Sequence, residues 1–314
     1  MNISYMAPLG RAWNRMTEAL FRPFDLHKWF VFGFSAFLAG MMDASNGGGS
    51  GRAGKEGNFG EFIHFPREAW AWFVSHPAWT AAILFAVLVV IAVVVALTWV
   101  SSRGVFMFLD NVVSDRVEIA RPWRDYEKEG NSLFVWRLLF GLFTFAVLGG
   151  ILTVFFVKGA EIYDRGLGPE LPILLIAGAM LAVLAFVLVW GYIALFLKDF
   201  VAAVMYRNRI SCAAAWRLFL DIFKKYPMHF IGYGLLIFLL MILLVIAVFA
   251  AVLGTCCIGL FFLIIPYIST VVTLPVWYTY RAFSLEFLAQ FGPEFDVFPK
   301  RSAEPAPLPA APAA

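Results

Sequence analysis

The chain has 314 residues, of which 62% are hydrophobic and 14% are charged, and its formal net charge is +3. Soluble domains contain about 45–50% apolar and about 25% charged residues, so the excess apolar surface is expected to face lipid. The small net charge argues against nucleic-acid binding, and three cysteines are too few for a disulfide framework.

Six apolar runs predict six transmembrane helices, because about 20 apolar residues in a helix cross a bilayer core. The first run is short, so a re-entrant segment is the alternative for it. Residues 1–28 are polar and lack a short apolar core, and no cleavable signal peptide is expected there. The six runs are residues 29–42, 78–100, 133–157, 171–197, 230–253 and 257–280.

Basic residues predict the orientation of these runs. The segment 1–28, the second and fourth loops and the segment 281–314 together hold 18 Lys or Arg, against five in the loops of the opposite side. By the positive-inside rule, both termini are expected in the cytoplasm, with the chain in a bacterial inner membrane.

The first loop contains a P-loop-like spacing at Gly49, Gly54 and Lys55. Glu56 stands where a P-loop has Ser or Thr, an apolar run precedes the stretch, and the loop is expected on the side away from cytoplasmic ATP. We therefore expect no nucleotide binding. Residues 43–60 are predicted to be a flexible Gly-rich outer loop, and residues 61–75 a helix on the outer surface.

A short repeat divides the chain into units. Residues 116–124 (RVEIARPWR) align with residues 209–217 (RISCAAAWR), and a fainter copy surrounds Trp13. Each copy precedes two apolar runs. The chain is thus predicted to be an all-α polytopic membrane protein of three units, each an elbow helix followed by a transmembrane hairpin. The domains are a cytoplasmic amphipathic segment (1–28), a transmembrane domain (29–280) and a cytoplasmic Pro/Ala-rich tail (281–314).

The elbow helices are predicted to be amphipathic, with apolar residues at helical spacing on one face and charges on the other. Such helices lie at a lipid surface and either sense lipid, dock a partner or simply anchor the next hairpin. The apolar face of the first is Leu9, Trp13, Met16 and Leu20, opposite Arg11, Arg15, Glu18 and Arg22, and that of the third is Trp216, Phe219 and Phe223, opposite Arg217, Asp221 and Lys224.

The chain resembles a group of uncharacterised prokaryotic six-helix membrane proteins. The resemblance is carried by residues 213–236 and by residues 22–40 with the Gly-rich loop that follows them. This group is distantly similar to the membrane domain attached to some glycerophosphodiester phosphodiesterases. The resemblance implies the six-helix architecture only. No stretch here corresponds to the catalytic barrel of those enzymes, so no catalytic residue is carried over.

The sequence offers few candidate catalytic or metal-ligating residues. No ionisable residue lies at the centre of an apolar run, and Arg137 and Lys198 lie near run ends, where they are expected to reach the interface. The four histidines do not pair at ligand spacing. We expect no enzyme activity, no metal and no cofactor.

The sixth run contains Pro266 and Pro275, which are predicted to kink it, and hydroxyl groups between and beside them. Tyr267, Thr270 and Thr273 share one face and are the candidate residues for lining a lipid or solute cavity. The alternative is that these hydroxyl groups satisfy backbone groups freed by proline or bond to other helices.

The leading functional hypothesis is a non-enzymatic membrane component that organises a partner or process. The alternative is a passive transporter or channel for a lipid or small amphiphile. The expected partners are membrane lipids and either another protein or further copies of the chain, and neither nucleic acid nor a nucleotide is expected.

Overall fold

The computed structural model describes residues 3–41, 59–166, 170–255, 259 and 264–298. Most of the Gly-rich loop, Cys256, Cys257 and the end of the Pro/Ala-rich tail lie outside these residues. No strand occurs in the described part, which confirms the all-α class. In chain order the elements are α1 (Met6–Phe21), α2 (Leu26–Gly40), α3 (Phe59–Ser75), α4 (Pro77–Ser114), α5 (Ala120–Asp125), α6 (Glu127–Asp164), α7 (Glu170–Phe196), the π-helix η2 (Leu197–Val201), α8 (Ala202–Asn208), α9 (Cys212–Lys225), α10 (Pro227–Gly254), α12 (Pro266–Val272), α13 (Leu274–Leu288) and the 3-10 turn η3 (Ala289–Phe291).

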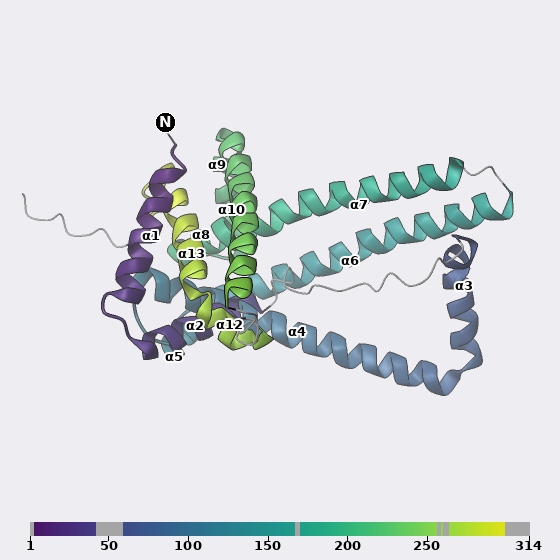
Figure 1. Cartoon of the computed structure of the whole chain (residues 1–314), viewed down its shortest axis with the longest axis horizontal. Helices are drawn as coiled ribbons and strands as arrows, with labels where there is room; N and C mark the ends of the chain where they lie inside the picture. Colours follow the sequence, from purple (N-terminus) through teal and green to yellow (C-terminus); the bar gives the residue numbers. More distant parts are fainter. Residues whose placement is uncertain (1–2, 42–58, 167–169, 256–258, 260–263, 299–314) are drawn as a thin grey trace, which may run out of the picture.

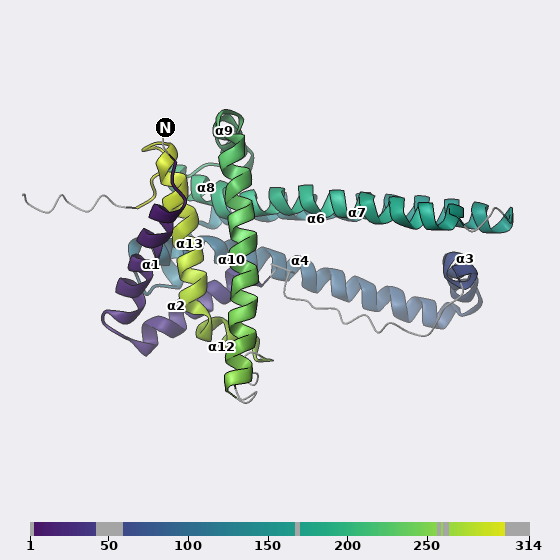
Figure 2. The same cartoon turned by 45° about the horizontal axis from the view of Figure 1, so that its top comes forward.

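The helices form a compact head and a set of long projections (Figure 1). The head consists of α1, α2, α5, η2, α8, α9, α12, α13 and residues 101–112 of α4. From it α4, α6 and α7 project in the same general direction, and α3 lies at their outer ends. Helix α10 runs across that direction near the head, as both views show (Figures 1 and 2).

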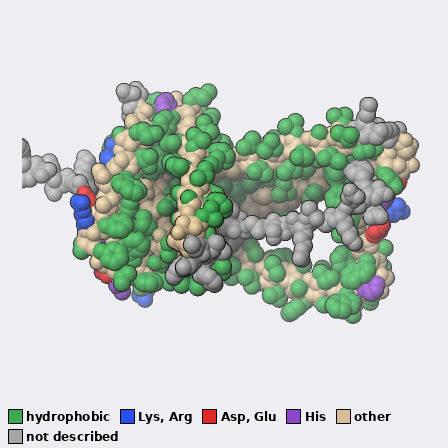
Figure 3. Space-filling model, in the orientation of Figure 1, with side chains coloured by type: hydrophobic (Ala, Val, Ile, Leu, Met, Phe, Trp, Pro, Cys, Tyr) green, Lys and Arg blue, Asp and Glu red, His purple; other side chains and the backbone are tan. Residues whose placement is uncertain are grey.

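Among the described residues, four helices are long and apolar enough to cross a membrane: Pro77–Ser114, Glu127–Asp164, Pro172–Asn208 and Pro227–Gly254. In the most apolar window of the first three, none of the residues is buried inside the protein, and in the fourth 6% are. Hydrophobic side chains cover these projections (Figure 3). The chain is therefore membrane-embedded, because such a surface is too apolar for water.

The first and sixth expected spans are not among these four long helices. Helix α2 has 15 residues, and the described part of the sixth run is divided between α12 and α13. Six spans and three repeated units thus stay predictions.

Local sequence explains where several helices begin. Asp25 caps α2, because its carboxylate accepts a hydrogen bond from the backbone N–H of His27 at 2.8 Å. Proline occupies the first turn of α4, α10 and α12 (Pro77, Pro227 and Pro266), where its missing N–H costs nothing.

Helix α4 belongs to both the projections and the head. Its 38 residues span about 57 Å at a rise of about 1.5 Å per residue, nearly twice the hydrocarbon thickness of about 30 Å. The outer half is exposed and apolar, whereas residues 101–112 are almost all buried and include Ser101, Ser102, Arg103 and Asn111. The chain then leaves the helix through Asp115, which has a left-handed backbone (φ 51°).

Helix α2 packs closely on this inner part of α4. Ser101 Oγ donates a hydrogen bond to the carbonyl oxygen of Ala39 at 3.1 Å. At Gly104 a Cβ atom would lie 2.7 Å from Leu38 Cβ and 2.8 Å from the Leu38 carbonyl carbon. Only glycine permits the two backbones to approach this closely.

The N-terminal helix α1 packs on the C-terminal helix α13. Ala12, Met16, Ala19 and Leu20 form its buried face, whereas Trp13 is 59% exposed. Arg11 Nε and Arg15 Nε each donate to Glu286 of α13 at 2.6 Å. Met16 and Leu20 therefore pack against protein, because the small Ala12 and Ala19 beside them let α13 approach.

The chain stays in the head beyond Tyr280, the expected end of the transmembrane domain. Helix α13 continues to Leu288, and every residue from 281 to 288 is buried. Arg281, which was counted among the basic residues of the expected tail, and Glu286 both have partners within the head. The apolar residues between them, such as Phe283 and Leu285, complete its core.

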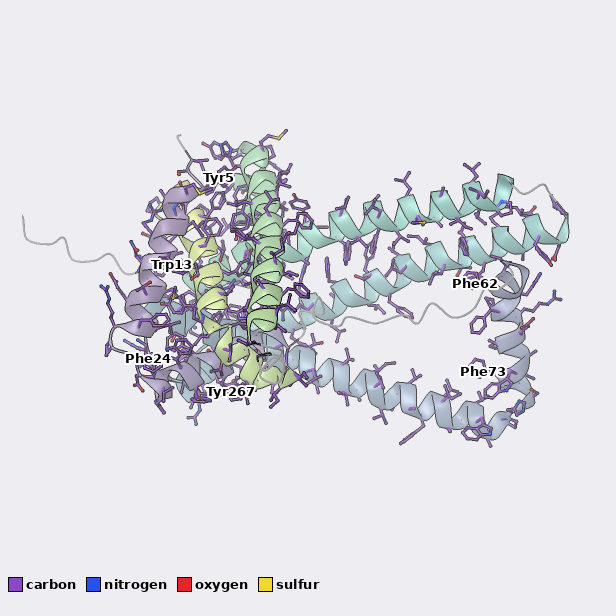
Figure 4. The ribbon with its side chains drawn as sticks, in the orientation of Figure 1. Tyr5, Trp13, Phe24, Phe62, Phe73 and Tyr267 are labelled. Carbon is purple, nitrogen blue, oxygen red and sulfur yellow. The ribbon has the colours of Figure 1, made fainter. Side chains whose placement is uncertain are left out.

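Helix α3 covers the outer end of α6, close to the expected outer surface helix. The Phe62 ring centre lies 5.6 Å from that of Phe156 and 6.3 Å from that of Phe155. Phe62 and Phe73 lie toward opposite ends of α3 (Figure 4). The helix thereby connects the outer ends of α4 and α6.

We predict that Gly104→Ala lowers the stability of the purified protein by about 1–3 kcal/mol, the usual effect of overpacking a close contact. Its Cβ would press on backbone atoms of α2, which cannot rotate away. Thermal unfolding in a mild detergent measures the effect. The matched control is Gly149→Ala on α6, where nothing lies within 4 Å of the new Cβ. Equal unfolding temperatures for the two variants would contradict the prediction.

Candidate functional site

The three candidate cavity residues lie on α12 and at its end. Tyr267 Oη donates to the carbonyl oxygen of Phe30 at 3.0 Å, and its ring lies against Phe30, Phe34 and Phe37 of α2 (Figure 4). Tyr267 therefore attaches α12 to α2.

Thr270 and Thr273 bond within their own helix. Thr270 Oγ1 donates to the carbonyl oxygen of Pro266 at 3.0 Å, and Thr273 Oγ1 to that of Ser269 at 2.6 Å. Trp277 Nε1 in turn donates to Thr273 Oγ1 at 3.0 Å. The two prolines divide the run, because Pro266 begins α12 and Pro275 lies in the first turn of α13. This arrangement supports the alternative in which the hydroxyl groups satisfy the backbone around the prolines.

A second group of polar residues is buried where three elements meet. We call Asp199, Tyr233, Tyr280 and Arg281 the polar centre. Asp199 lies in η2, which continues α7 as a π-helical turn, a feature found mostly at functional sites. Its side chain has no exposed surface, and Arg281 of α13 is 4% exposed.

Hydrogen bonds surround the Asp199 carboxylate. Tyr280 Oη donates to Oδ2 at 2.7 Å, and Tyr233 Oη of α10 donates to the same atom at 3.0 Å. Arg281 Nη1 lies 4.0 Å from Oδ1 and donates to the carbonyl oxygen of Lys198 at 2.6 Å. Within the described residues Oδ1 accepts no hydrogen bond. Because the Asp199 carboxylate is fully buried, these neighbours must stabilise it in place of solvent.

Aromatic rings enclose the polar centre. The Tyr233 ring centre lies 4.8 Å from those of Phe200 and Phe287. On the other side, Lys198 Nζ lies 5.5 Å from the Trp277 ring and 5.4 Å from the Tyr280 ring. These contacts exclude water from Asp199 and place a second cation beside it.

Sequence reasoning did not identify the polar centre. Lys198 was expected to reach the interface, and Asp199 and Arg281 follow immediately after apolar runs, where charged residues usually lie in loops. The available signal was the adjacent Lys198–Asp199 pair directly after an apolar run.

A related cluster connects the two segments that the sequence predicts to be copies of a repeat. Asp110 of α4 accepts hydrogen bonds from Tyr206 Oη at 2.8 Å and Tyr126 Oη at 3.3 Å. The Arg209 guanidinium lies 3.6 Å from the Tyr126 ring centre, and its Nη1 donates to the carbonyl oxygen of Asp125 at 2.7 Å. Burial raises the pKa of Tyr126 above its ordinary value. The phenol therefore stays protonated and acts as a donor.

The matching tryptophans of the repeat each contact the inner end of a projecting helix. The Trp123 ring lies 6.0 Å from Trp99 of α4, and Arg103 lies over both rings at 5.4 and 4.5 Å. The Trp216 ring lies 5.9 Å from Trp136 of α6. Each elbow thus packs against a helix that continues into the membrane.

The remaining chemistry of the head is modest. Burial raises the pKa of the Cys212 thiol to about 12, so it is protonated and a poor nucleophile at neutral pH. Among the described residues, no group of three or more His, Cys, Asp or Glu could hold a metal ion.

An apolar groove of about 390 Å³ lies between α7, α9 and α10, and we call it the α7–α9 groove. The candidate cavity residues do not line it. Its walls are Val189, Tyr192, Ile193 and Phe196 of α7, Trp216, Phe219, Leu220 and Phe223 of α9, and Ile231 of α10.

We predict that Asp199→Ala lowers the stability of the folded protein by about 3–5 kcal/mol, the cost of leaving a buried charged partner uncompensated. Asp199→Asn retains an acceptor for the two tyrosines but loses the negative charge. Its stability is therefore expected to lie between that of the wild type and that of Asp199→Ala. Thermal unfolding in detergent measures both. Asp221→Ala, at an exposed position on α9, is the control, and an Asp199→Ala variant as stable as this control would refute the role of the polar centre.

Comparisons with known proteins find one uncharacterised family. A model described as a family of unknown function, DUF7544, matches residues 5–268. No curated protein and no solved structure matches the chain. The resemblance to the membrane domain of glycerophosphodiester phosphodiesterases stays a prediction. Because the match covers most of its length, the chain belongs to the DUF7544 family of unknown function.

Proposed function

We propose that this protein is a non-enzymatic component of a bacterial inner membrane that organises other membrane proteins. The observation that carries the proposal is the exposure of its apolar helices. The most apolar windows of α4, α6 and α7 bury none of their residues within the protein, and that of α10 buries almost none. In a membrane these faces contact lipid or the spans of another protein.

Contacts within the head hold the projecting helices so that their apolar faces stay available to other membrane proteins. The inner ends of α4 and α7 continue into it, and their buried polar residues bind partners on other helices. Outside the head, α3 lies against α6 at the opposite end. The projecting helices are thereby fixed at both ends while their middle parts stay open to lateral contacts.

The proposed orientation places the head in the cytoplasm. The head contains most of the basic residues counted for the positive-inside rule. Helix α3 and the outer ends of α6 and α7 then lie on the outer side. Both termini belong to the cytoplasmic side in this arrangement.

A catalytic role is disfavoured by the engagement of the polar groups. The carboxylates of Asp110, Asp199 and Glu286 bind tyrosine or arginine side chains of the same head. Such contacts stabilise helix packing. We therefore assign these residues to the scaffold that supports the membrane helices.

A test of this proposal places a photo-crosslinking amino acid at Phe145 on α6 or Met180 on α7, which are 78% and 68% exposed. Irradiation of intact membranes is expected to yield a discrete protein adduct from at least one site. The adduct is identified by mass spectrometry, and a second, differently tagged copy distinguishes a homo-oligomer from another protein.

The matched control for this experiment is the same amino acid at Phe106, which is fully buried in the head. No intermolecular adduct is expected from it. If the exposed sites yield lipid adducts alone, the partner-organising function is overturned.

A second candidate, a passive transporter for a lipid or small amphiphile, is favoured by the division of the sixth run at Thr273. Interrupted membrane helices form the substrate sites of many transporters. The leading proposal predicts that vesicles containing the protein move a fluorescent lipid between leaflets no faster than empty vesicles. Faster movement that Thr270→Val or Thr273→Val abolishes would favour the transporter instead.

A further inference from the structure

The α7–α9 groove has the size and lining of a ligand site. Its volume of about 390 Å³ lies within the range of about 300–1,000 Å³ for small-molecule pockets. Tyrosine, phenylalanine, tryptophan and aliphatic side chains form all of its walls. Such a lining fits a hydrocarbon chain.

Contacts among its wall residues hold the groove together. Phe196 of α7 lies 5.3 Å from Phe219 and 5.5 Å from Phe223 of α9, measured between ring centres. Tyr192 Oη donates to the carbonyl oxygen of Ile231 at 3.2 Å, which ties α7 to α10. The groove is thus built into the junction of three helices.

The groove lies on α7 close to the end of its apolar run, where the lipid headgroup boundary is expected. Val187, Leu188 and Val189 are all more than half exposed and lead directly to its rim. A few residues further, the apolar run ends at Lys198 and Asp199. An acyl chain on the surface of α7 therefore reaches the groove without crossing water.

The charge beside the groove favours an anionic headgroup. Helix α9 exposes Arg217, Lys224 and Lys225 against a single acid, Asp221. Lys224 follows the rim residue Leu220 by four positions, so the two share a face of the helix. Basic groups at this depth attract anionic lipids.

Two indole groups near the groove lack an acceptor. The Nε1 atoms of Trp216, which lines the groove, and of Trp136, whose ring lies 5.9 Å away, are buried without a hydrogen-bond partner in the described part of the chain. An unpaired buried N–H is unfavourable. The ester oxygens of a lipid are acceptors of the kind that these groups lack.

We propose that the α7–α9 groove binds an acyl chain of an anionic phospholipid, with the headgroup facing Arg217, Lys224 and Lys225. A transmembrane helix is about 10 Å across with its side chains, too wide for a groove of this volume. The proposal requires only that α7 lies in a membrane. It is independent of any protein partner.

The test uses the full-length protein, purified in a mild detergent and studied by native mass spectrometry with added phosphatidylglycerol or phosphatidylethanolamine. We expect one tightly retained phosphatidylglycerol. Leu220→Trp, which fills the groove, is expected to reduce its binding at least fivefold. The matched control, Leu184→Trp, adds the same side chain at an exposed position on α7 and should bind as the wild type does.

The headgroup part of the proposal is tested by Lys224→Gln with Lys225→Gln. Loss of these charges should weaken phosphatidylglycerol binding by about fivefold for each lysine near the surface and leave phosphatidylethanolamine binding unchanged. Equal binding of the two lipids by the wild type would overturn the anionic preference.

A photoactivatable phosphatidylglycerol bound to the wild-type protein keeps the proposal testable if Leu220→Trp does not fold. Adducts are expected on α7 and α9 residues of the groove. Adducts confined to other helices, or a folded Leu220→Trp variant that binds as the wild type does, would overturn the groove as the site. Because only purified protein is used, these results do not depend on the partner-organising function.

Discussion

The burial of the Asp199 carboxylate is the constraint on which the rest of the head depends. A charge without solvent requires opposite charge and hydrogen bonds in fixed positions. Tyr280 and Arg281 of α13 and Tyr233 of α10 meet this requirement together. Helices α13 and α10 and the inner end of α7 are thereby held at one point. The packing of α1 on α13 through Glu286 then adds the N-terminal helix to the same unit.

The long helices combine two environments that demand different side chains. Their outer parts face lipid, where polar groups are costly, so they carry almost only aliphatic and aromatic residues. Their inner parts face other helices, where Ser101, Asp110 and Asp199 find partners from neighbouring elements. The change from one environment to the other occurs within a continuous helix in α4 and through the π-helical turn η2 after α7. A membrane helix thus becomes part of the folded head without a flexible linker.

The proposed functions follow from this division. A head that holds itself together leaves the membrane faces of α4, α6 and α7 available for other spans. The α7–α9 groove lies where the two environments meet, with aromatic walls on the lipid side and the cations of α9 beside it. Lipid binding at that boundary would add to the packing of α9 on α7. It would couple the composition of the inner leaflet to the position of a helix that also supports α10.

The apolar runs and the basic flanks are local properties, and from the runs the sequence by itself determined the all-helical membrane class. Of the six expected spans, four coincide with described helices that are long and apolar enough to cross a membrane. The sequence also predicted helices around Trp13, Trp123 and Trp216, where α1, α5 and α9 lie, since helical spacing is readable along the chain. Only the tertiary structure decided which charges are buried. Asp199, Arg281 and Glu286 flank apolar runs as loop residues do, and their partners lie on other helices, up to 275 positions away in the case of Arg11. The hydroxyl groups of Thr270 and Thr273 likewise suggested a cavity, but their acceptors depend on how the prolines divide the helix. Local sequence patterns indicate whether a segment faces water or lipid. The pairing of buried polar groups depends instead on contacts between segments that are distant in the sequence.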